Sequence, residues 1–161
     1  LSDIYQSQLL TMPPQVELRL ELPQADTTIR TDASRLKQVV NNLINNAAKF
    51  TDKGNITFGY RTADGAGEVE LFVRDTGIIL QVKDDGIGIP EDDLNRIFER
   101  FYKADSYVKG VGLGLSICRT ITELLGGEIS VVSAPGEGTC FKIVHPVRRT
   151  ETAAETAGAY R

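Results

Sequence analysis

Hydrophobic and polar residues alternate strictly from Val16 to Leu22, which predicts a half-buried β-strand. Shorter stretches, rich in β-branched and apolar residues and bounded by glycine, proline or polar residues, predict further strands. These are a short strand at 27–31 and two hairpins, one joining 55–61 to 68–74 and the other joining 128–133 to 139–145. We therefore expect a sheet that is rich in antiparallel pairs.

Four other stretches predict helices. A short amphipathic helix is expected over 1–12, and a longer one from Ala33 to about Phe50, with Asp32 as its N-cap. A third is expected over 90–101, where the acidic first turn suits the helix dipole. The fourth follows the glycine-rich run 110–114 and ends near Leu125, before Gly126 and its glycine neighbour.

The helix after Asp32 has an unusual polar side, with four asparagines in six positions. Its apolar face consists of Leu36, Val39, Val40, Leu43, Ile44 and Ala47. Asn42, Asn46 and Lys49 fall on the opposite side, in a stripe about 60° wide. Asparagine is a weak helix former, so this stripe is either a solvated face or a binding surface. As a binding surface, its amide oxygens suit Mg²⁺ and its ammonium suits phosphate.

Two glycine-rich segments could approach a ligand closely. Residues 84–90 (DDGIGIP) follow an apolar stretch, and an aspartate there could accept a hydrogen bond from an exocyclic amine such as adenine N6. Residues 110–116 (GVGLGLS) open a helix, whose N-terminal N–H groups can bind an anion. Neither segment is a Walker A loop or a Rossmann fingerprint. Each, taken alone, is equally consistent with an ordinary loop.

The overall composition narrows the classes of function. The chain has 161 residues, 41% hydrophobic and 25% charged, which suits one globular domain. A net charge of -4 argues against nucleic-acid binding by the chain as a whole. Apolar runs such as 77–80 are much shorter than the roughly 20 residues of a membrane-spanning helix. Cys118 and Cys140 are expected to be reduced thiols, and the single histidine, His145, is not expected to be catalytic.

Five segments follow one another in a characteristic order. They are 42–51 (NLINNAAKFT), 84–90 (DDGIGIP), 97–103 (IFERFYK), 110–115 (GVGLGL) and 133–141 (SAPGEGTCF). They resemble the N box, first glycine box, F box, second glycine box and closing element of the catalytic and ATP-binding domain of bacterial sensor histidine kinases. This domain belongs to the GHKL superfamily of gyrases, heat-shock chaperones, histidine kinases and MutL. The resemblance runs from about Val16 to Val147.

The resemblance implies an α+β fold, the two-layer α/β sandwich of the Bergerat (GHKL) type. A mixed, mostly antiparallel sheet of about five strands would be covered on one face by about three helices, with an extra strand or β arm expected near 68–83. Residues 1–148 would form a single ATP-binding domain and 149–161 a disordered tail. Because the chain begins at Leu1, we expect a fragment that lacks the upstream dimerisation and phosphoacceptor domain.

The resemblance also implies a nucleotide site for ATP and Mg²⁺. Its residues would be Asn42, Asn46, Lys49, Phe50, Asp84, Gly86, Gly88, Tyr102, Lys103, Gly110, Gly112, Leu113, Gly114, Leu115 and Thr139. Asn46 would coordinate Mg²⁺, while Asn42 and Lys49 would contact phosphate oxygens and Phe50 would pack beside the nucleotide. Asp84 would take the adenine amino group.

The remaining positions would complete the pocket. Gly88 would let the base lie close, and Tyr102 and Lys103 would flank the ribose and phosphates. The glycines at 110, 112 and 114 would frame the triphosphate, beneath the two leucines at 113 and 115. Thr139 would support the adenine pocket. Phe50, Leu115 and Thr139 are equally candidates for plain core residues.

Position 42 separates two reaction classes in this superfamily. Hydrolysing members have a glutamate there, whereas asparagine cannot act as a base. The domain is therefore expected to hold ATP and to donate its γ-phosphate to a histidine on the separate upstream domain. Alone, it should not autophosphorylate. Its partners would be that domain and, indirectly, a response regulator, in the cytoplasm, with a parent protein that is an inner-membrane sensor. The alternatives are a degenerate docking or dimerisation module, or an anti-sigma-type serine kinase.

The chain departs from the family pattern in three places. The segment 102–109 is shorter than the usual lid, and Val111 stands where a threonine is common. The sequence VRDTGI at 73–78 is also repeated as VKDDGI at 82–87. Residues 79–87 therefore resemble an insertion or tandem duplication. We prefer Asp84 over Asp75 as the adenine ligand, because the family spacing to the F box follows Asp84.

Overall fold

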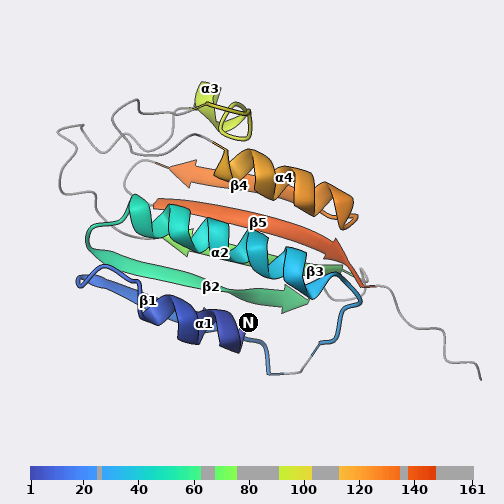
Figure 1. Cartoon of the computed structure of the whole chain (residues 1–161), viewed down its shortest axis with the longest axis horizontal. Helices are drawn as coiled ribbons and strands as arrows, with labels where there is room; N and C mark the ends of the chain where they lie inside the picture. Colours follow the sequence, from blue (N-terminus) through green and yellow to red (C-terminus); the bar gives the residue numbers. More distant parts are fainter. Residues whose placement is uncertain (25–26, 63–67, 76–90, 103–112, 135–137, 148–161) are drawn as a thin grey trace, which may run out of the picture.

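The computed structural model describes residues 1–24, 27–62, 68–75, 91–102, 113–134 and 138–147. Within these ranges, five strands form one sheet and helices lie against it (Figure 1). The elements are α1 (Ser2–Leu9), β1 (Val16–Glu21), α2 (Ala33–Lys49), β2 (Gly54–Thr62), β3 (Glu68–Asp75), α3 (Glu91–Leu94), α4 (Gly114–Leu124), β4 (Glu128–Ala134) and β5 (Gly138–Pro146). No helix in the described part of the chain is both long and apolar enough to cross a bilayer.

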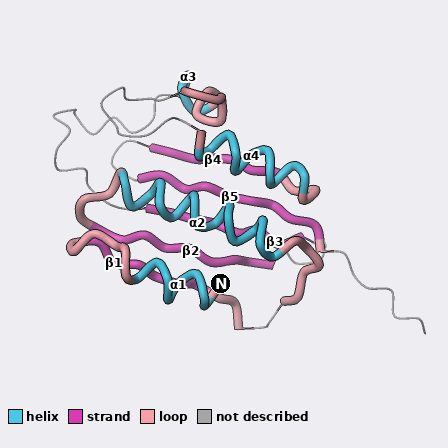
Figure 2. Tube along the Cα trace, viewed as in Figure 1, coloured by secondary structure: helices cyan, strands magenta, loops and turns pink. Residues whose placement is uncertain are grey.

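The sheet has the strand order β1-β2-β3-β5-β4. β1 and β2 pair in parallel, and the other three pairs are antiparallel. Helices α1, α2 and α4 cover one face of the sheet, so the fold has two layers (Figure 2). This confirms the predicted α+β sandwich with a mixed, mostly antiparallel sheet of five strands.

The core lies between these two layers. Alternate residues of the strands point into it, as the strict period of two in Val16–Leu22 predicted. The apolar face of α2 packs against them, and its Val39 and Ile44 are completely buried. Burying such side chains contributes about 1.5–3 kcal/mol each, which makes this face the main anchor of α2.

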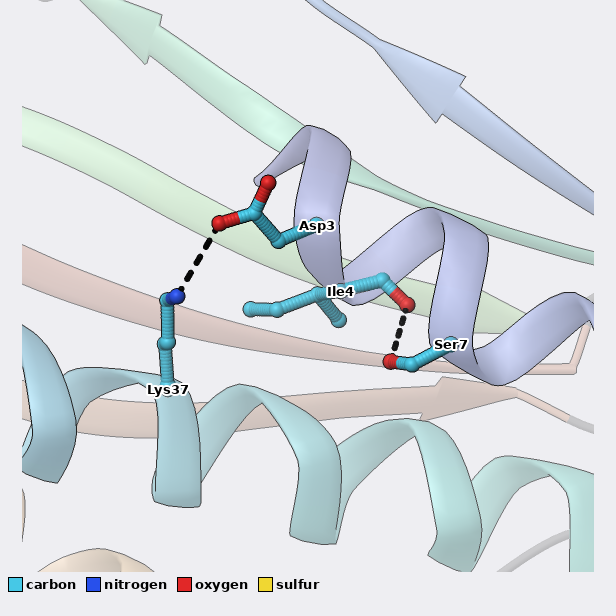
Figure 3. Close-up of polar contacts among 4 residues, drawn as sticks. All are labelled: Asp3, Ile4, Ser7 and Lys37. Atoms are coloured by element: carbon cyan, nitrogen blue, oxygen red, sulfur yellow. Dashed lines mark hydrogen bonds and ion pairs between the residues drawn. The ribbon is translucent and has the colours of Figure 1, made fainter.

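Local chemistry fixes where α2 begins and how α1 contacts it. The Asp32 carboxylate accepts a hydrogen bond from the Arg35 amide at 3.0 Å, which confirms the predicted N-cap. Lys37 on the first part of α2 forms an ion pair with Asp3 of α1 at 3.1 Å (Figure 3). Both side chains are exposed, so this pair orients α1 and adds little stability.

One glycine is required by the parallel strand pair. A Cβ on Gly59 would lie 1.9 Å from the backbone oxygen of Glu21, its register partner in β1. No side chain larger than hydrogen fits there without displacing β1. Gly59 therefore allows the edge strand β1 to approach β2.

Three predicted elements differ from the structure. The predicted strand at 27–31 does not form: its ends bond to side chains instead, with the Thr27 amide donating to the Tyr60 hydroxyl and Thr31 contacting a ring nitrogen of His145. The helix predicted over 1–12 ends at Leu9. The helix predicted over 90–101 is only the single turn α3, followed by turns up to Phe101, whose φ of 63° is incompatible with a right-handed helix.

Of the stretch 68–83, where an extra strand or β arm was expected, the structure describes only 68–75. Residues 68–75 are β3, a central strand of the sheet. Residues 76–83, the second copy of the repeat at 82–87 and the predicted tail 149–161 lie outside the described residues.

Candidate functional site

Several chain segments that carry predicted site residues meet at one end of the sheet. Strand register shows this directly, because Asp75 at the end of β3 lies opposite Ile56 near the start of β2, and Arg74 lies opposite Cys140 near the start of β5. Four residues separate the end of α2 from the start of β2. α4 runs from this end of the sheet toward the opposite end, where β4 starts. We call this the site end of the sheet (Figure 1).

The asparagine stripe of α2 lies beside α4 and not on a fully solvated face. Asn42 and Asn46 are half-buried, and only Lys49 is exposed. The two helices are joined there, because the thiol of Cys118 on α4 donates to the Val39 carbonyl of α2, with sulfur and oxygen 3.8 Å apart. The side chain of Asn46 has no hydrogen-bond partner among the described residues. An amide held in a half-buried place with its polar atoms unengaged is suited to bind a ligand.

The other two asparagines of α2, Asn41 and Asn45, lie outside this stripe. Asn41 accepts a hydrogen bond from Gln8 of α1 at 3.0 Å, so it joins α1 to α2. Asn45 is exposed. The four asparagines therefore separate into a structural contact on one flank of α2 and a candidate ligand surface on the other.

The end of α2 adds two further groups. The Lys49 ammonium lies 5.7 Å from the ring centroid of Phe50, which is half-buried. Thr51 comes next and is 1% exposed, and its hydroxyl has no hydrogen-bond partner in the described part of the chain. Sequence reasoning did not single out Thr51, because a threonine after a helix gives no signal of burial.

The start of α4 presents backbone donors. Leu113 is the N-cap, and its apolar side chain makes no capping hydrogen bond. The hydroxyl of Ser116 and the amide of Ile117 both donate to the Leu113 carbonyl, at 2.9 and 3.0 Å, so the first turn is well formed. Gly114 is exposed, and a Cβ built on it meets no described atom within 4 Å. Uncapped N–H groups beside open space can bind an anion.

The aromatic residue predicted to flank the ligand is held by its neighbours. The Tyr102 hydroxyl donates a hydrogen bond to the carboxylate of Asp93, and the Arg96 guanidinium lies 4.4 Å from the centre of the Tyr102 ring. The hydrogen bond to Asp93 raises the pKa of Tyr102 above its usual value. The acidic turn at 91–93 was visible in the sequence, but its role in holding Tyr102 was not.

Thr139 and Leu115 occupy supporting positions. The Thr139 hydroxyl lies 3.1 Å from that of Ser133 across the β4–β5 pair. Leu115 is half-buried and packs against the core, as its alternative interpretation allowed. The other predicted residues, Asp84, Gly86, Gly88, Lys103, Gly110 and Gly112, lie outside the described residues. Of Asp75, the backbone is described, at the site end of β3.

Three residues with reactive side chains are buried or half-buried. His145 is 2% exposed, and its two ring nitrogens contact the carbonyl of Pro146 and the hydroxyl of Thr31. Both nitrogens of this buried ring are therefore occupied by neighbouring oxygen atoms. Burial raises the pKa of the Cys118 thiol to about 11, and burial also raises that of Cys140. Both thiols are free, as predicted.

The donor chemistry limits how a metal could be held. The described residues contain no cluster of three histidine, cysteine or carboxylate side chains that could hold a metal ion. An amide such as Asn46 offers one neutral oxygen ligand. This suits Mg²⁺, which commonly keeps water and phosphate oxygens as its other ligands.

Comparison with known proteins gives a consistent result. The sequence matches the family described as histidine kinase-, DNA gyrase B- and HSP90-like ATPase over residues 31–149. It is 38% identical over 138 residues to the adaptive-response sensory kinase SasA of Prochlorococcus marinus, covering 82% of this chain and 33% of that protein. It is 33% identical over 147 residues to the sensor histidine kinase WalK of Bacillus subtilis, covering 88% of this chain and 23% of that protein. This chain thus spans a third or less of these two curated relatives.

Solved structures agree with this similarity. The mycobacterial sensor histidine kinase MprB superposes with a TM-score of 0.73 at 27% identity, over 92% of this chain and 93% of that one. The histidine kinase ThkA, solved in complex with the response regulator protein TrrA, superposes with a TM-score of 0.68 at 26% identity, over 91% of this chain and 39% of that one.

Proposed function

Since the chain belongs to the histidine kinase-, DNA gyrase B- and HSP90-like ATPase family and is a histidine-kinase catalytic domain, we propose that it binds Mg²⁺–ATP at the site end and donates the γ-phosphate to a histidine of another domain. The observation that carries this proposal is the Asn42–Asn46 surface beside the uncapped start of α4. It offers neutral oxygens, backbone donors and a nearby ammonium, and no carboxylate stands at position 42 to activate water.

The described residues would share the work of holding the nucleotide. Lys49 would neutralise phosphate charge, and the N–H groups at the start of α4 would donate to phosphate oxygens. Asn46 would contribute an oxygen to Mg²⁺, which, when bound, would offset the negative charge of the phosphates. Tyr102, oriented by Asp93, would border the ribose. Phosphoryl transfer depends mainly on such positioning and charge neutralisation.

The adenine end of the site depends on one of two aspartates. We propose Asp84, since the spacing to the following glycine, proline and F box is that of the family. The backbone position of Asp75 at the site end makes it the alternative. Titration of Asp84→Asn and Asp75→Asn with a non-hydrolysable ATP analogue separates the two. Loss of binding in Asp84→Asn alone is expected, and loss in Asp75→Asn alone would move the adenine contact to the first copy of the repeat.

The acceptor histidine would come from another domain. His145, the only histidine of the chain, is 2% exposed and held in the core, so it is not available to receive a phosphoryl group. We propose a dimerisation and phosphotransfer domain of the same parent protein as the partner, with a response regulator downstream of it and a cytoplasmic location for this domain. The similar kinase ThkA was solved with a response regulator protein, which supports this order.

The reaction is tested by following label from γ-labelled ATP. The chain alone should incorporate none, and adding a phosphotransfer domain with its histidine should produce labelled partner. Label on the chain alone would contradict transfer in trans. Absence of ATP-analogue binding at millimolar concentration with Mg²⁺ would favour the degenerate docking module, which the relatives do not otherwise support.

A further inference from the structure

The last three residues of β2, 60–62, extend beyond the end of the neighbouring strand β1. The register between the two strands stops at Glu21, which lies opposite Gly59, and the chain then leaves the sheet through Leu22 and Pro23. On their other side, residues 60–62 still pair with β3. In the described part of the chain, the end of β2 is therefore a short open edge, at the end of the sheet away from the site end.

A cavity of about 300 Å³ lies beside this open edge. Leu22 and Pro23 line it on the side of β1, and Tyr60, Arg61 and Phe72 line it on the side of β2 and β3. Leu22 is 50% exposed, so the cavity has an apolar wall that solvent reaches. This volume is at the lower limit of about 300 Å³ for small-molecule pockets, and it suits side chains of a partner better than a whole cofactor.

The ring of Phe72 supports one of the charged groups at the cavity. Phe72 is only 5% exposed, yet it is not part of the core cluster between the two layers, so it belongs to the face of the sheet away from the helices. The guanidinium carbons of Arg61 and Arg74 lie 5.0 and 5.9 Å from its ring centroid and cover it there. A guanidinium that stacks on a ring keeps its N–H groups available in its own plane, where they can bind a carboxylate.

Arg61 differs from its basic neighbours on this face in having no carboxylate partner. Arg74 forms an ion pair with Glu21 at 3.5 Å, and Lys142 forms one with Glu70 at 3.7 Å. No ion pair joins Arg61 to any described residue. The cavity thus has one unpaired positive charge next to the paired Glu21, which matches a single carboxylate and would repel a dianionic phosphate.

We propose that the open edge of β2 and this cavity bind an extended peptide segment of a partner protein, in which an acidic residue is flanked by apolar residues. The segment would lie along 60–62 as an added strand. Because successive side chains of a strand point to opposite faces, its acidic side chain would meet Arg61 on the face away from the helices. Its apolar neighbours would point to the other face, where Leu22 and Tyr60 lie. This site is separate from the nucleotide site, so the proposed function does not depend on it.

Two capped tripeptides, acetyl-Leu-Glu-Leu-amide and acetyl-Leu-Gln-Leu-amide, test this proposal by NMR titration of the whole chain. The glutamate peptide should shift the backbone amide signals of 60–62 and the Nε–H signal of Arg61 in a saturable way. The glutamine peptide should bind about fivefold more weakly. This factor is the upper end for an exposed ion pair, and we expect it because stacking on Phe72 already orients Arg61.

Variants assign the effect to the unpaired guanidinium. Arg61→Gln should bind the two peptides with the same low affinity. Arg61→Lys keeps the charge but loses the planar stack, so its preference for the glutamate peptide should be intermediate. Arg19→Gln is the matched control, since Arg19 lies on β1 and is already paired with Glu17 at 2.7 Å, and it should leave both affinities unchanged. Urea unfolding of each variant shows whether it is folded.

Several results would overturn the proposal, and all of them leave the nucleotide site untouched. Equal binding of the two peptides by the unmodified chain would exclude recognition of the acidic residue. Absence of saturable shifts at 60–62 with millimolar glutamate peptide would exclude the site. A shift of the Arg61 signal in Glu151→Gln without peptide would assign the cavity to the C-terminal segment of this chain, and a shift on raising the protein concentration alone would assign it to a second copy.

Discussion

Replacing Gly114 with alanine separates the folding role of this glycine from its role at the site. Gly114 is the first residue of α4 and has no positive φ, and a Cβ on it would meet no described atom within 4 Å. Alanine is favoured over glycine inside helices by roughly 0.5–1 kcal/mol. At the first helical position we expect the lower part of this range, about 0.5 kcal/mol of added stability. For a domain of this size that raises Tm by about 1–2 °C.

Nucleotide binding should change in the opposite direction. If phosphates lie against the start of α4, the added methyl group occupies space that they need, and ATP-analogue affinity should fall by at least about tenfold, or 1.4 kcal/mol. Thermal unfolding and an analogue titration, made on the same sample, measure both effects. A destabilised Gly114→Ala would contradict the open geometry, and unchanged affinity would contradict phosphate binding at this turn.

Gly127→Ala is the matched control for this experiment. Its Cβ would lie 2.6 Å from the backbone oxygen of Val144, at the end of the sheet away from the site. Such overpacking costs about 1–3 kcal/mol, so Tm should fall by several degrees. Affinity for the analogue, measured below the transition, should stay the same.

The remaining predictions concern the core and two titrating groups. Gly59→Ala should destabilise the fold by about 2–3 kcal/mol in urea unfolding, because β1 must move away from the added Cβ, and an unchanged midpoint would contradict the strand pairing. The pKa of Tyr102 is raised in the folded state by its hydrogen bond to Asp93, so this bond stabilises the fold fully at pH values below the unfolded-state pKa of about 10. The stabilisation is lost as pH rises through the higher folded-state pKa. Asp93→Asn should lower that pKa in an ultraviolet titration referenced to Tyr102→Phe, and an unmoved pKa would refute the cause given. Thiol reagent at neutral pH should modify Cys140 slowly and Cys118 only after unfolding, because burial holds the pKa of Cys118 near 11, and rapid modification of both thiols in the native chain would contradict this.

Sequence patterns that span only a few residues correctly predicted most of the strands and the helix α2. The alternation in Val16–Leu22 gave β1, the Asp32 cap and apolar face gave α2, and the two hairpins gave β2–β3 and β4–β5 within a residue or two. These signals agree with the tertiary structure because each element buries the face that its own period defines.

One strand prediction failed where long-range contacts decide, and one helix prediction failed where the backbone changes conformation. The stretch 27–31 looks like a strand, but its polar groups are taken by Tyr60 and His145, which are far away in sequence. The stretch 90–101 has an acidic helix start, yet its chain turns at Phe101 into a left-handed conformation. The contacts with Tyr60 and His145 cannot be predicted from the few residues around 27–31.

In the candidate site, too, local patterns predicted one part, and the other part depends on contacts between distant residues. Periodicity placed Asn42 and Asn46 on one stripe of α2, and the structure keeps them together there. It could not show that this stripe borders α4, because that depends on how two helices separated by more than sixty residues pack. The contact of Cys118 with Val39 was missed for this reason, and that of Asp93 with Tyr102 was missed because a helix was expected throughout 90–101.

A titration of the chain with a non-hydrolysable ATP analogue, with and without Mg²⁺, tests the central claim most directly. Calorimetry should show saturable binding of one equivalent with Mg²⁺. Binding should weaken when Mg²⁺ is chelated, and also in Asn46→Ala, while the exposed neighbour Asn45→Ala should behave like the unmodified chain. Absence of binding at millimolar analogue with Mg²⁺ present, by a chain shown to be folded, would contradict the assignment of this end of the sheet as a nucleotide site.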